Sequence, residues 1–210
     1  AIELCRRHAG RIWVAAGIHP HEAAGVNDSH FDKLYHIWLS TGVIGCGEMG
    51  LDYFYDFSPR QQQQVVFARQ LRLARPLDLP IVIHCRDAHA DVVRILLDEG
   101  YAGRRVVFHC YSGTGDEAAE LRSHGWWTSF TGIVTFSKSR EMQHVCVATP
   151  GNEIMFETDS PYLSPEPVRK MRPNEPATLV HTVRCAAALR GESFKTLGES
   201  STANAIEFFS

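Results

Sequence analysis

Four side chains of metal-binding types lie at the ends of apolar runs in the sequence. Glu48 ends VIGCGE, His84 ends PIVIH, His109 follows VVF, and Asp159 ends IMFETD. Taken singly, each has an ordinary explanation, such as a hydrogen-bonded core histidine, a helix cap or a buried ion pair. A carboxylate at the end of a buried strand is nevertheless costly unless it is paired or bound to a cation. A divalent metal satisfies carboxylates and imidazoles together, so the four residues predict a shared metal site.

Five further polar residues follow the same runs and are candidate substrate contacts. They are His19, Arg86, Ser112, Arg172 and Asn174. Arg86 could fork onto a phosphate or only pair with Asp87. Ser112 opens a segment where helix N–H groups could hold an anion, or its hydroxyl could be only the N-cap. His19 could equally be a solvated imidazole of its turn, and the turn 172–176, bracketed by prolines, is of a kind that is usually only structural.

Three aromatic residues, Phe54, Tyr55 and Phe57, follow Glu48 closely in the sequence. Exposed aromatic rings beside a site can stack on nucleobases. Core packing, or a lid over the site, is the interpretation that we favour for these three rings.

Short apolar strands that alternate with helical segments must position these residues. The runs are continuously apolar, which indicates strands buried on both faces, as in a parallel sheet covered by helices. Successive runs are roughly 25 to 35 residues apart, the length of one strand–helix unit. We predict strands over 12–17, 43–48, 80–84, 106–110, 127–132 and 154–159.

Helix signals fill the intervals between the predicted strands. Asp28 or Ser29 can cap the first helix, and Ser58 begins a capping box with proline at the first helical position. Gly100 and Gly125 are placed to end two later helices in the left-handed conformation. We predict helices over 31–40, 59–75, 88–98, 116–124, 175–189 and 200–208.

Two α/β layouts accommodate this series of units, a (β/α)₈ barrel and an open doubly wound sheet. The spelling G-x-G-x-x-G occurs at 45–50, but it begins inside a predicted strand, and none follows a strand and opens a helix, which removes the simplest dinucleotide-binding version of the open sheet. Barrel enzymes build their active sites at the carboxyl ends of the strands, where the four ionisable residues are predicted to lie. The barrel type is therefore favoured, with residues 1–210 as a single domain.

The composition limits the partners of the chain. It has 210 residues with 21 Lys+Arg against 24 Asp+Glu, a formal net charge of −3, which argues against nucleic-acid binding through a basic surface. No apolar run approaches the roughly 20 residues of a membrane span. The six cysteines show no clustered spacing, and the first residues do not resemble a signal peptide. We expect a cytoplasmic protein with reduced thiols that does not bind membranes.

Several longer motifs follow one another in an order that resembles one known family. They are GIHPHEA (17–23), GEMGLDYFYDFSPRQQQ (47–63), PIVIHCRDAHAD (80–91), FHCYSGT (108–114) and ETDSPYLSPEPVRKMRPNEP (157–176). The chain resembles the TatD-family metal-dependent deoxyribonucleases, which are amidohydrolase-like (β/α)₈ barrels. The resemblance implies hydrolysis of DNA phosphodiesters, often from the 3′ end, by a monomer that holds two divalent cations. Magnesium is the first expectation for these cations, with manganese or zinc as alternatives.

The resemblance also implies roles for the four strand-end residues. Glu48 would bridge the two metals, and His84 and His109 would hold one of them. Asp159 would ligate the other metal and orient or deprotonate the attacking water, so Glu48 and Asp159 are the implied catalytic residues. Two cations stabilise the attacking and leaving oxygens of an in-line displacement, and they would supply positive charge that this acidic chain lacks.

The chain departs from the family pattern at its start. Family members begin with a strand that carries His-x-His, and no such pair precedes Ile12. His19 and His21 have this spacing but belong to the later GIHPH loop, so we do not assign them to the metal. We therefore expect an N-terminally incomplete barrel, with about six of the eight β/α units and the first two strands missing.

Two other functions remain open from the sequence. The same residues could hydrolyse a non-nucleic ester or amide, such as an aminoacyl-tRNA ester. The chain could also be a non-catalytic fragment or binding module that has lost one metal site.

Overall fold

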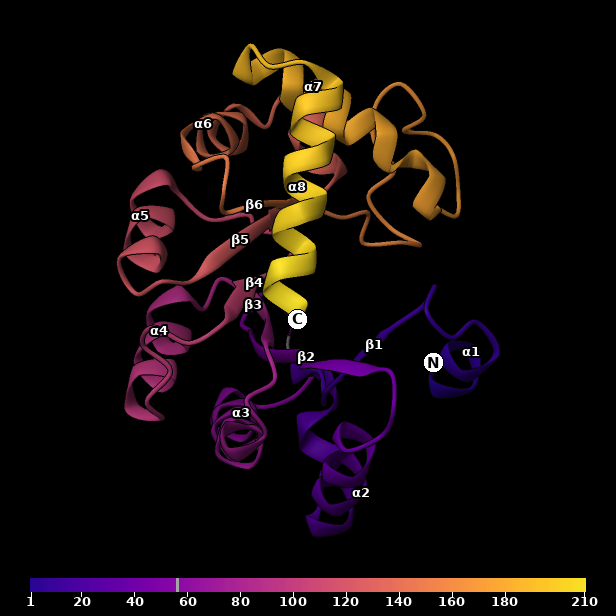
Figure 1. Ribbon diagram of the computed structural model, residues 1–210. Helices are drawn as coiled ribbons and strands as arrows, with labels where there is room; N and C mark the ends of the chain where they lie inside the picture. Colours follow the sequence, from indigo (N-terminus) through magenta and orange to yellow (C-terminus); the bar gives the residue numbers. More distant parts are fainter. Residues whose placement is uncertain (56) are drawn as a thin grey trace. The chain divides into compact units, whose positions relative to one another are not determined.

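The computed structural model describes every residue of the chain except residue 56, and all six predicted runs contain a strand (Figure 1). The chain divides into two compact units. The first comprises Ala1–Val107 together with Phe209–Ser210, and the second comprises Phe108–Phe208.

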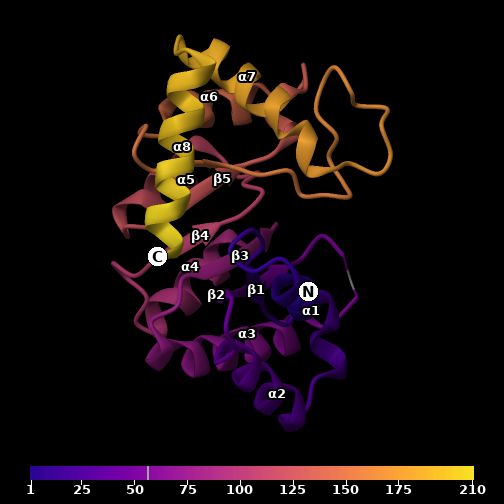
Figure 2. The same ribbon diagram turned by 45° about the vertical axis from the view of Figure 1, so that its right-hand side comes forward.

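The first unit carries parallel strands covered by helices. Ala16 pairs with Cys46 and Gly50 pairs with His84, each across parallel neighbours, and the Ile81 N–H donates to the Arg105 carbonyl. Both views show α2 and α3 on the same side of these strands (Figures 1 and 2). The elements are α1 (Ile2–Arg7), β1 (Val14–Ala16), η1 (Pro20–Gly25), α2 (Asp28–Trp38), β2 (Val43–Asp52), α3 (Arg60–Ala74), η2 (Arg75–Leu77), β3 (Ile81–Arg86), α4 (His89–Asp98) and β4 (Val106–Phe108), the last of which ends at the division between the units.

The second unit repeats the pattern with a shorter pair of strands. Thr128 pairs with Ile154 and Phe130 with Phe156, again in parallel. The connection from the last strand to η4 is a long irregular loop, drawn in orange in Figure 2. The elements are α5 (Gly115–Ser123), β5 (Trp127–Phe130), η3 (Gly132–Thr135), α6 (Arg140–Ala148), β6 (Ile154–Phe156), η4 (Pro176–Thr178), α7 (Leu179–Arg190) and α8 (Phe194–Phe209). The predicted α/β class with parallel strands is confirmed.

Strand β2 is longer than predicted, and this changes the place of Glu48. The strand continues to Asp52, which pairs with Arg86 of β3, so Glu48 lies inside the strand and not at its end. Two glycines allow the extension. Gly47 has φ +154 and Gly50 has φ +144, and a Cβ at Gly47 would lie 2.5 Å from the Val82 carbonyl oxygen of β3. Glycines that look like strand breakers in the sequence therefore permit the close approach of two strands.

Two predicted helix N-caps are wrong. Asn27 caps α2, in place of Asp28 or Ser29, by accepting from the Ser29 N–H. Ser58 does not cap α3. Its hydroxyl donates to the His21 carbonyl at 2.7 Å and accepts from the Ala24 N–H at 2.9 Å, so it ties the start of α3 to η1. Tertiary contacts here outcompete local capping.

The caps and starts of helices in the second unit also differ from the predictions. Thr114 caps α5, in a capping box with Glu117, so the interpretation of Ser112 as the N-cap is wrong. Helix α8 begins at Phe194, six residues before the predicted start at Ser200, and α6 was not predicted. The long apolar runs identify elements better than they identify their ends.

The six cysteines are free thiols. Burial raises the pKa of the Cys46 and Cys146 thiols to about 12, so both stay protonated and pack as small apolar groups. None of the helices among the described residues has both the length and the apolar character that a membrane crossing needs.

Asn204 of α8 should contribute more to the stability of the second unit than any exposed residue of the same helix. Its buried Nδ2 donates to the carbonyls of Gly151 and Ile154, at 2.9 Å each. Removing a buried donor leaves acceptors unsatisfied, so Asn204→Ala should lower the free energy of unfolding by about 2 kcal/mol. Urea denaturation measures the loss, and the exposed Glu207→Ala in the same helix is the control. Equal unfolding midpoints for the two variants would contradict the expectation.

Candidate metal centre

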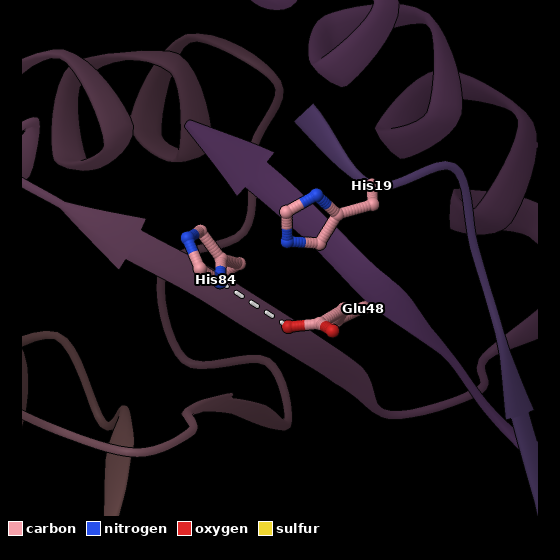
Figure 3. A group of neighbouring side chains, drawn as sticks. All are labelled: His19, Glu48 and His84. Carbon is pink, nitrogen blue, oxygen red and sulfur yellow. Dashed lines mark hydrogen bonds and ion pairs between the residues drawn. The ribbon is translucent and has the colours of Figure 1, made fainter. Parts of the chain in front are cut away.

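Three side chains from neighbouring parallel strands of the first unit meet at one point. His19 follows β1, Glu48 lies in β2 and His84 lies in β3, and one ligand atom of each lies within 4.8 Å of the others (Figure 3). All three side chains are partly buried. Glu48 and His84 were predicted to share a metal, and the structure brings them together. His19 was predicted as a substrate contact, and the structure places it beside them.

The His84 ring is held from one side by a buried carboxylate. Its Nε2 lies 3.0 Å from Oδ2 of Asp52, whose side chain is 1% exposed. Its Nδ1 lies 3.3 Å from Oε2 of Glu48. When the Nε2 of His84 donates its proton to Asp52, the Nδ1 carries only a lone pair. That lone pair then faces the carboxylate oxygen of Glu48, which is also an acceptor, and the two atoms repel each other. A cation bound between them removes the repulsion, so this pair of residues fits a divalent metal.

Asp52 organises the site although it was not among the predicted site residues. Its Oδ2 also lies 2.9 Å from His21 Nε2, and its Oδ1 accepts from the N–H groups of Phe54 and Tyr55 at 3.0 Å each. Burial acts to raise the pKa of Asp52, but the Tyr55 N–H and the two imidazoles outweigh it and hold the pKa below its ordinary value. The carboxylate is therefore ionised at neutral pH and can hold both rings.

Gln63 of α3 fixes Asp52 in turn. Its Oε1 accepts from the Asp52 N–H at 2.8 Å, and its Nε2 donates to the Asp52 carbonyl at 3.0 Å and to the Ser58 carbonyl at 2.9 Å. The side chain of Gln63 is buried. A helix thus sets the position of the strand end that carries Asp52.

His19 is neutral at physiological pH and has a defined proton position. Burial, and then the neighbouring His84, lower the pKa of His19 to about 4. Its Nδ1 accepts from the His21 N–H at 3.1 Å, so in the neutral ring the proton lies on Nε2. A ring that donates through Nε2 is suited to a substrate oxygen. To bind a metal through Nε2, His19 would first have to lose the bond to His21.

His109 and Asp159 both belong to the second unit. His109 directly follows β4, and its Nδ1 lies 3.5 Å from Oε2 of Glu157. Asp159 lies three residues beyond the end of β6 and has φ +54. It is therefore in the loop and not at the strand end, because β6 is shorter than predicted. The shared site of Glu48, His84, His109 and Asp159 stays a prediction.

Glu157 is a second carboxylate that sequence reasoning missed. It accepts from the Ser129 hydroxyl and, at 2.7 Å, from the Cys110 N–H. Burial acts to raise the pKa of Glu157, but His109, the Ser129 hydroxyl and the Cys110 N–H together hold the pKa below its ordinary value. Asp52 and Glu157 could have been found by the same signal that identified Glu48 and Asp159, an acidic residue that follows an apolar run.

The remaining predicted substrate contacts have varied surroundings. Asn174 is buried. Its Nδ2 donates to the carbonyls of Thr158 at 3.0 Å and Tyr162 at 2.6 Å, which holds the loop after β6. Arg172 is exposed and donates to loop carbonyls, including that of Arg169 at 3.1 Å. Ser112 is exposed near the start of α5. Their contacts with substrate stay predictions.

Arg86, the last residue of β3, lies over aromatic rings. Its guanidinium carbon is 3.9 Å from the centroid of the Phe54 ring and 4.9 Å from that of Tyr55. The predicted phosphate contact of Arg86 stays a prediction.

The sequence matches known proteins over its whole length. The model of the TatD related DNase family matches residues 1–210. The chain is 37% identical to the 3'-5' ssDNA/RNA exonuclease TatD of Cronobacter sakazakii, over 100% of the chain and 81% of that protein. It is 35% identical to the uncharacterized metal-dependent hydrolase YabD of Bacillus subtilis, over 94% of the chain and 77% of that protein.

Two solved structures have a similar fold. A TatD-family hydrolase from Entamoeba histolytica matches with a TM-score of 0.90 and 22% identity, over 100% of the chain and 79% of that protein. The TatD homolog YJJV from Escherichia coli matches with a TM-score of 0.90 and 24% identity, over 98% of the chain and 80% of that protein. This likeness concerns the fold, and it confirms the predicted barrel-type α/β architecture. From the family match over all its residues and the two relatives above, the chain belongs to the TatD related DNase family of hydrolases.

Proposed function

We propose that the protein is a divalent-metal-dependent hydrolase that cleaves phosphodiester bonds of DNA, as an exonuclease, with a metal-activated water. The observation that carries the proposal is the pair formed by Glu48 and His84. Their facing atoms are 3.3 Å apart, and the second nitrogen of His84 is already engaged by Asp52. The pair resembles other metal sites in which a carboxylate behind a histidine orients the ring that binds the ion.

The relatives support the choice of substrate. The Cronobacter sakazakii protein is named as an exonuclease that acts on single-stranded DNA and RNA in the 3'-5' direction. We propose that this chain also acts on single-stranded DNA and shortens it from the 3' end. RNA as a further substrate is an outcome of the test.

The side chains of the first unit have separable roles in this proposal. When bound, the cation supplies a Lewis acid for a phosphoryl oxygen and acidifies a water molecule. Glu48 and the Nδ1 of His84 would hold the cation, and Asp52 fixes the His84 ring through Nε2. His19, neutral and protonated on Nε2, donates to a phosphate oxygen.

Two residues of the second unit are assigned through the family motifs. By that resemblance, His109 would contribute to metal binding, and Asp159 would ligate metal and orient or deprotonate the attacking water. The Glu157 carboxylate lies 3.5 Å from the Nδ1 of His109, and we assign it a positioning role for this ring.

Metal removal tests the proposal directly. Single-stranded DNA labelled at either the 5' or the 3' end is incubated with the protein and magnesium, manganese or zinc. We expect stepwise shortening from the 3' end, loss of all cleavage in EDTA, and recovery when excess metal is added back. The metal that restores the highest rate identifies the preferred ion.

Two outcomes would overturn the proposal. Cleavage that persists in EDTA would remove the metal from the reaction. Turnover of ester or amide substrates, without any nuclease activity under the same conditions, would replace DNA as the substrate.

A further inference from the structure

We propose that Phe54, Tyr55 and Phe57 form a platform on which unpaired nucleobases of a single-stranded nucleic acid stack. These three side chains, here called the aromatic platform, follow β2 directly. Their exposed fractions are 55%, 38% and 64%, so the expectation that they pack in the core is wrong. Large rings exposed side by side at the edge of a candidate active site indicate a binding surface.

The rings are already ordered against one another. Tyr55 and Phe57 are stacked, with centroids 5.2 Å apart and an interplanar angle of 15°. Phe54 meets Tyr55 edge-on at 4.8 Å, and the Arg86 guanidinium lies over both of these rings. Because their mutual contacts hold the rings in place, a base that stacks on them pays little ordering entropy.

The aromatic platform is continuous with the candidate metal centre. The His21 ring lies edge-on to Phe57 at 4.8 Å and to Tyr55 at 5.4 Å, while its Nε2 bonds to Asp52 at 2.9 Å. The other carboxylate oxygen of Asp52 accepts from the backbone of Phe54 and Tyr55. Asp52 thus holds both the His84 ring and the backbone of the platform residues Phe54 and Tyr55. The His21 ring centroid is also 6.1 Å from that of His84, so a base on these rings would lie near the candidate metal centre.

Charge favours a nucleobase as the occupant. The chain has a formal net charge of −3, so a general basic surface does not supply its affinity for nucleic acid. Stacking supplies affinity that does not depend on net charge, and it accepts every base because each has a π-face. The guanidinium of Arg86 at the platform adds one cation where a backbone phosphate would pass.

The proposal rests on the proposed function for its substrate, but it is tested by binding without turnover. Fluorescence anisotropy in EDTA measures the affinity for a labelled single-stranded oligothymidylate. A second oligomer of equal length carries abasic deoxyribose units, which keep the phosphates and lack the bases. Phe57→Leu and Tyr55→Leu keep an apolar side chain and remove the ring.

A matched control exists in the second unit. Phe194 is 44% exposed, and the Arg184 guanidinium lies 5.2 Å from its ring centroid. We expect Phe57→Leu and Tyr55→Leu each to weaken binding of the oligothymidylate about tenfold and to leave binding of the abasic oligomer unchanged. Phe194→Leu should bind both oligomers like the parent, and circular dichroism checks that every variant is folded.

Three results would overturn the platform. These are parent-like affinity of both platform variants for oligothymidylate, equal affinity of the parent for the two oligomers, or no measurable binding. A change of oligomeric state in the platform variants, with unchanged DNA affinity, would assign the rings to contact with a second copy of the chain instead.

The two proposals fail separately. If Glu48→Gln loses cleavage while the platform variants bind and cut like the parent, the platform is wrong and the nuclease proposal stands. If no metal supports cleavage but binding depends on bases and on the rings, the platform stands and the nuclease proposal fails.

Discussion

Glu48→Gln should abolish metal-dependent cleavage, lowering its rate by about 10³-fold or more. The amide has nearly the same shape as the carboxylate but carries no charge, so the change removes the attraction for a cation and leaves the packing intact. A catalytic metal contributes several kcal/mol to transition-state stabilisation, and about 4 kcal/mol corresponds to a factor of about 10³ in rate. The Nδ1 of His84, 3.3 Å from Glu48, would then lack its charged neighbour.

Calorimetric titration with metal, run beside the cleavage assay, measures both consequences of the Glu48 change. Metal affinity and rate should fall together. The exposed Glu199→Gln, which loses only a 3.9 Å surface contact with Lys195, is the control and should match the parent in both. If Glu48→Gln leaves metal affinity and the cleavage rate unchanged, Glu48 does not hold the metal that cleavage needs. If the parent also shows no activity, the chain acts as a non-catalytic binding module.

Gly50→Ala should destabilise the first unit by about 3 kcal/mol or more and should displace His84. Gly50 has φ +144, a conformation that L side chains rarely adopt, and a Cβ there would collide with the backbone carbonyl of His84. Strain of this kind costs about 1 to 3 kcal/mol before the collision is counted. Since Gly50 and His84 are paired residues of β2 and β3, the strands must separate at the residue that we propose as a metal ligand.

A second glycine offers the control for this change. Gly198 lies inside α8, and a Cβ there meets nothing within 4 Å. Gly198→Ala should therefore stabilise the protein by about 0.5 to 1 kcal/mol, because alanine favours the helix. Urea denaturation and metal titration measure both variants. Parent-like unfolding and metal affinity in Gly50→Ala would show that the strands can part there without loss.

The strands were predictable because burial on both faces leaves an apolar signature. Every predicted run contains a strand, and the run ending at His84 forms the strand beside the one that carries Glu48. The length of β2 was not predictable in this way. Gly47 and Gly50 look like strand breakers until β3 is known to approach them.

Residues that act through long-range hydrogen bonds were harder to find. Asp52 bonds to the side chain of His21, 31 positions away in the chain. Ser58 donates to the carbonyl of His21, 37 positions away. Local rules therefore assigned Ser58 to helix capping and gave Asp52 no role. His19 was found as a candidate, but the position of its proton depends on the turn that brings the His21 N–H to its Nδ1.

The two oxygens of Asp52 face different neighbours, His84 and His21 on one side and the N–H groups of Phe54 and Tyr55 on the other. Whatever orders the loop after β2 also orders the ring that faces Glu48, and the reverse holds by thermodynamic reciprocity. If the proposed metal and the proposed nucleic acid both bind, we therefore expect each to favour the binding of the other through Asp52.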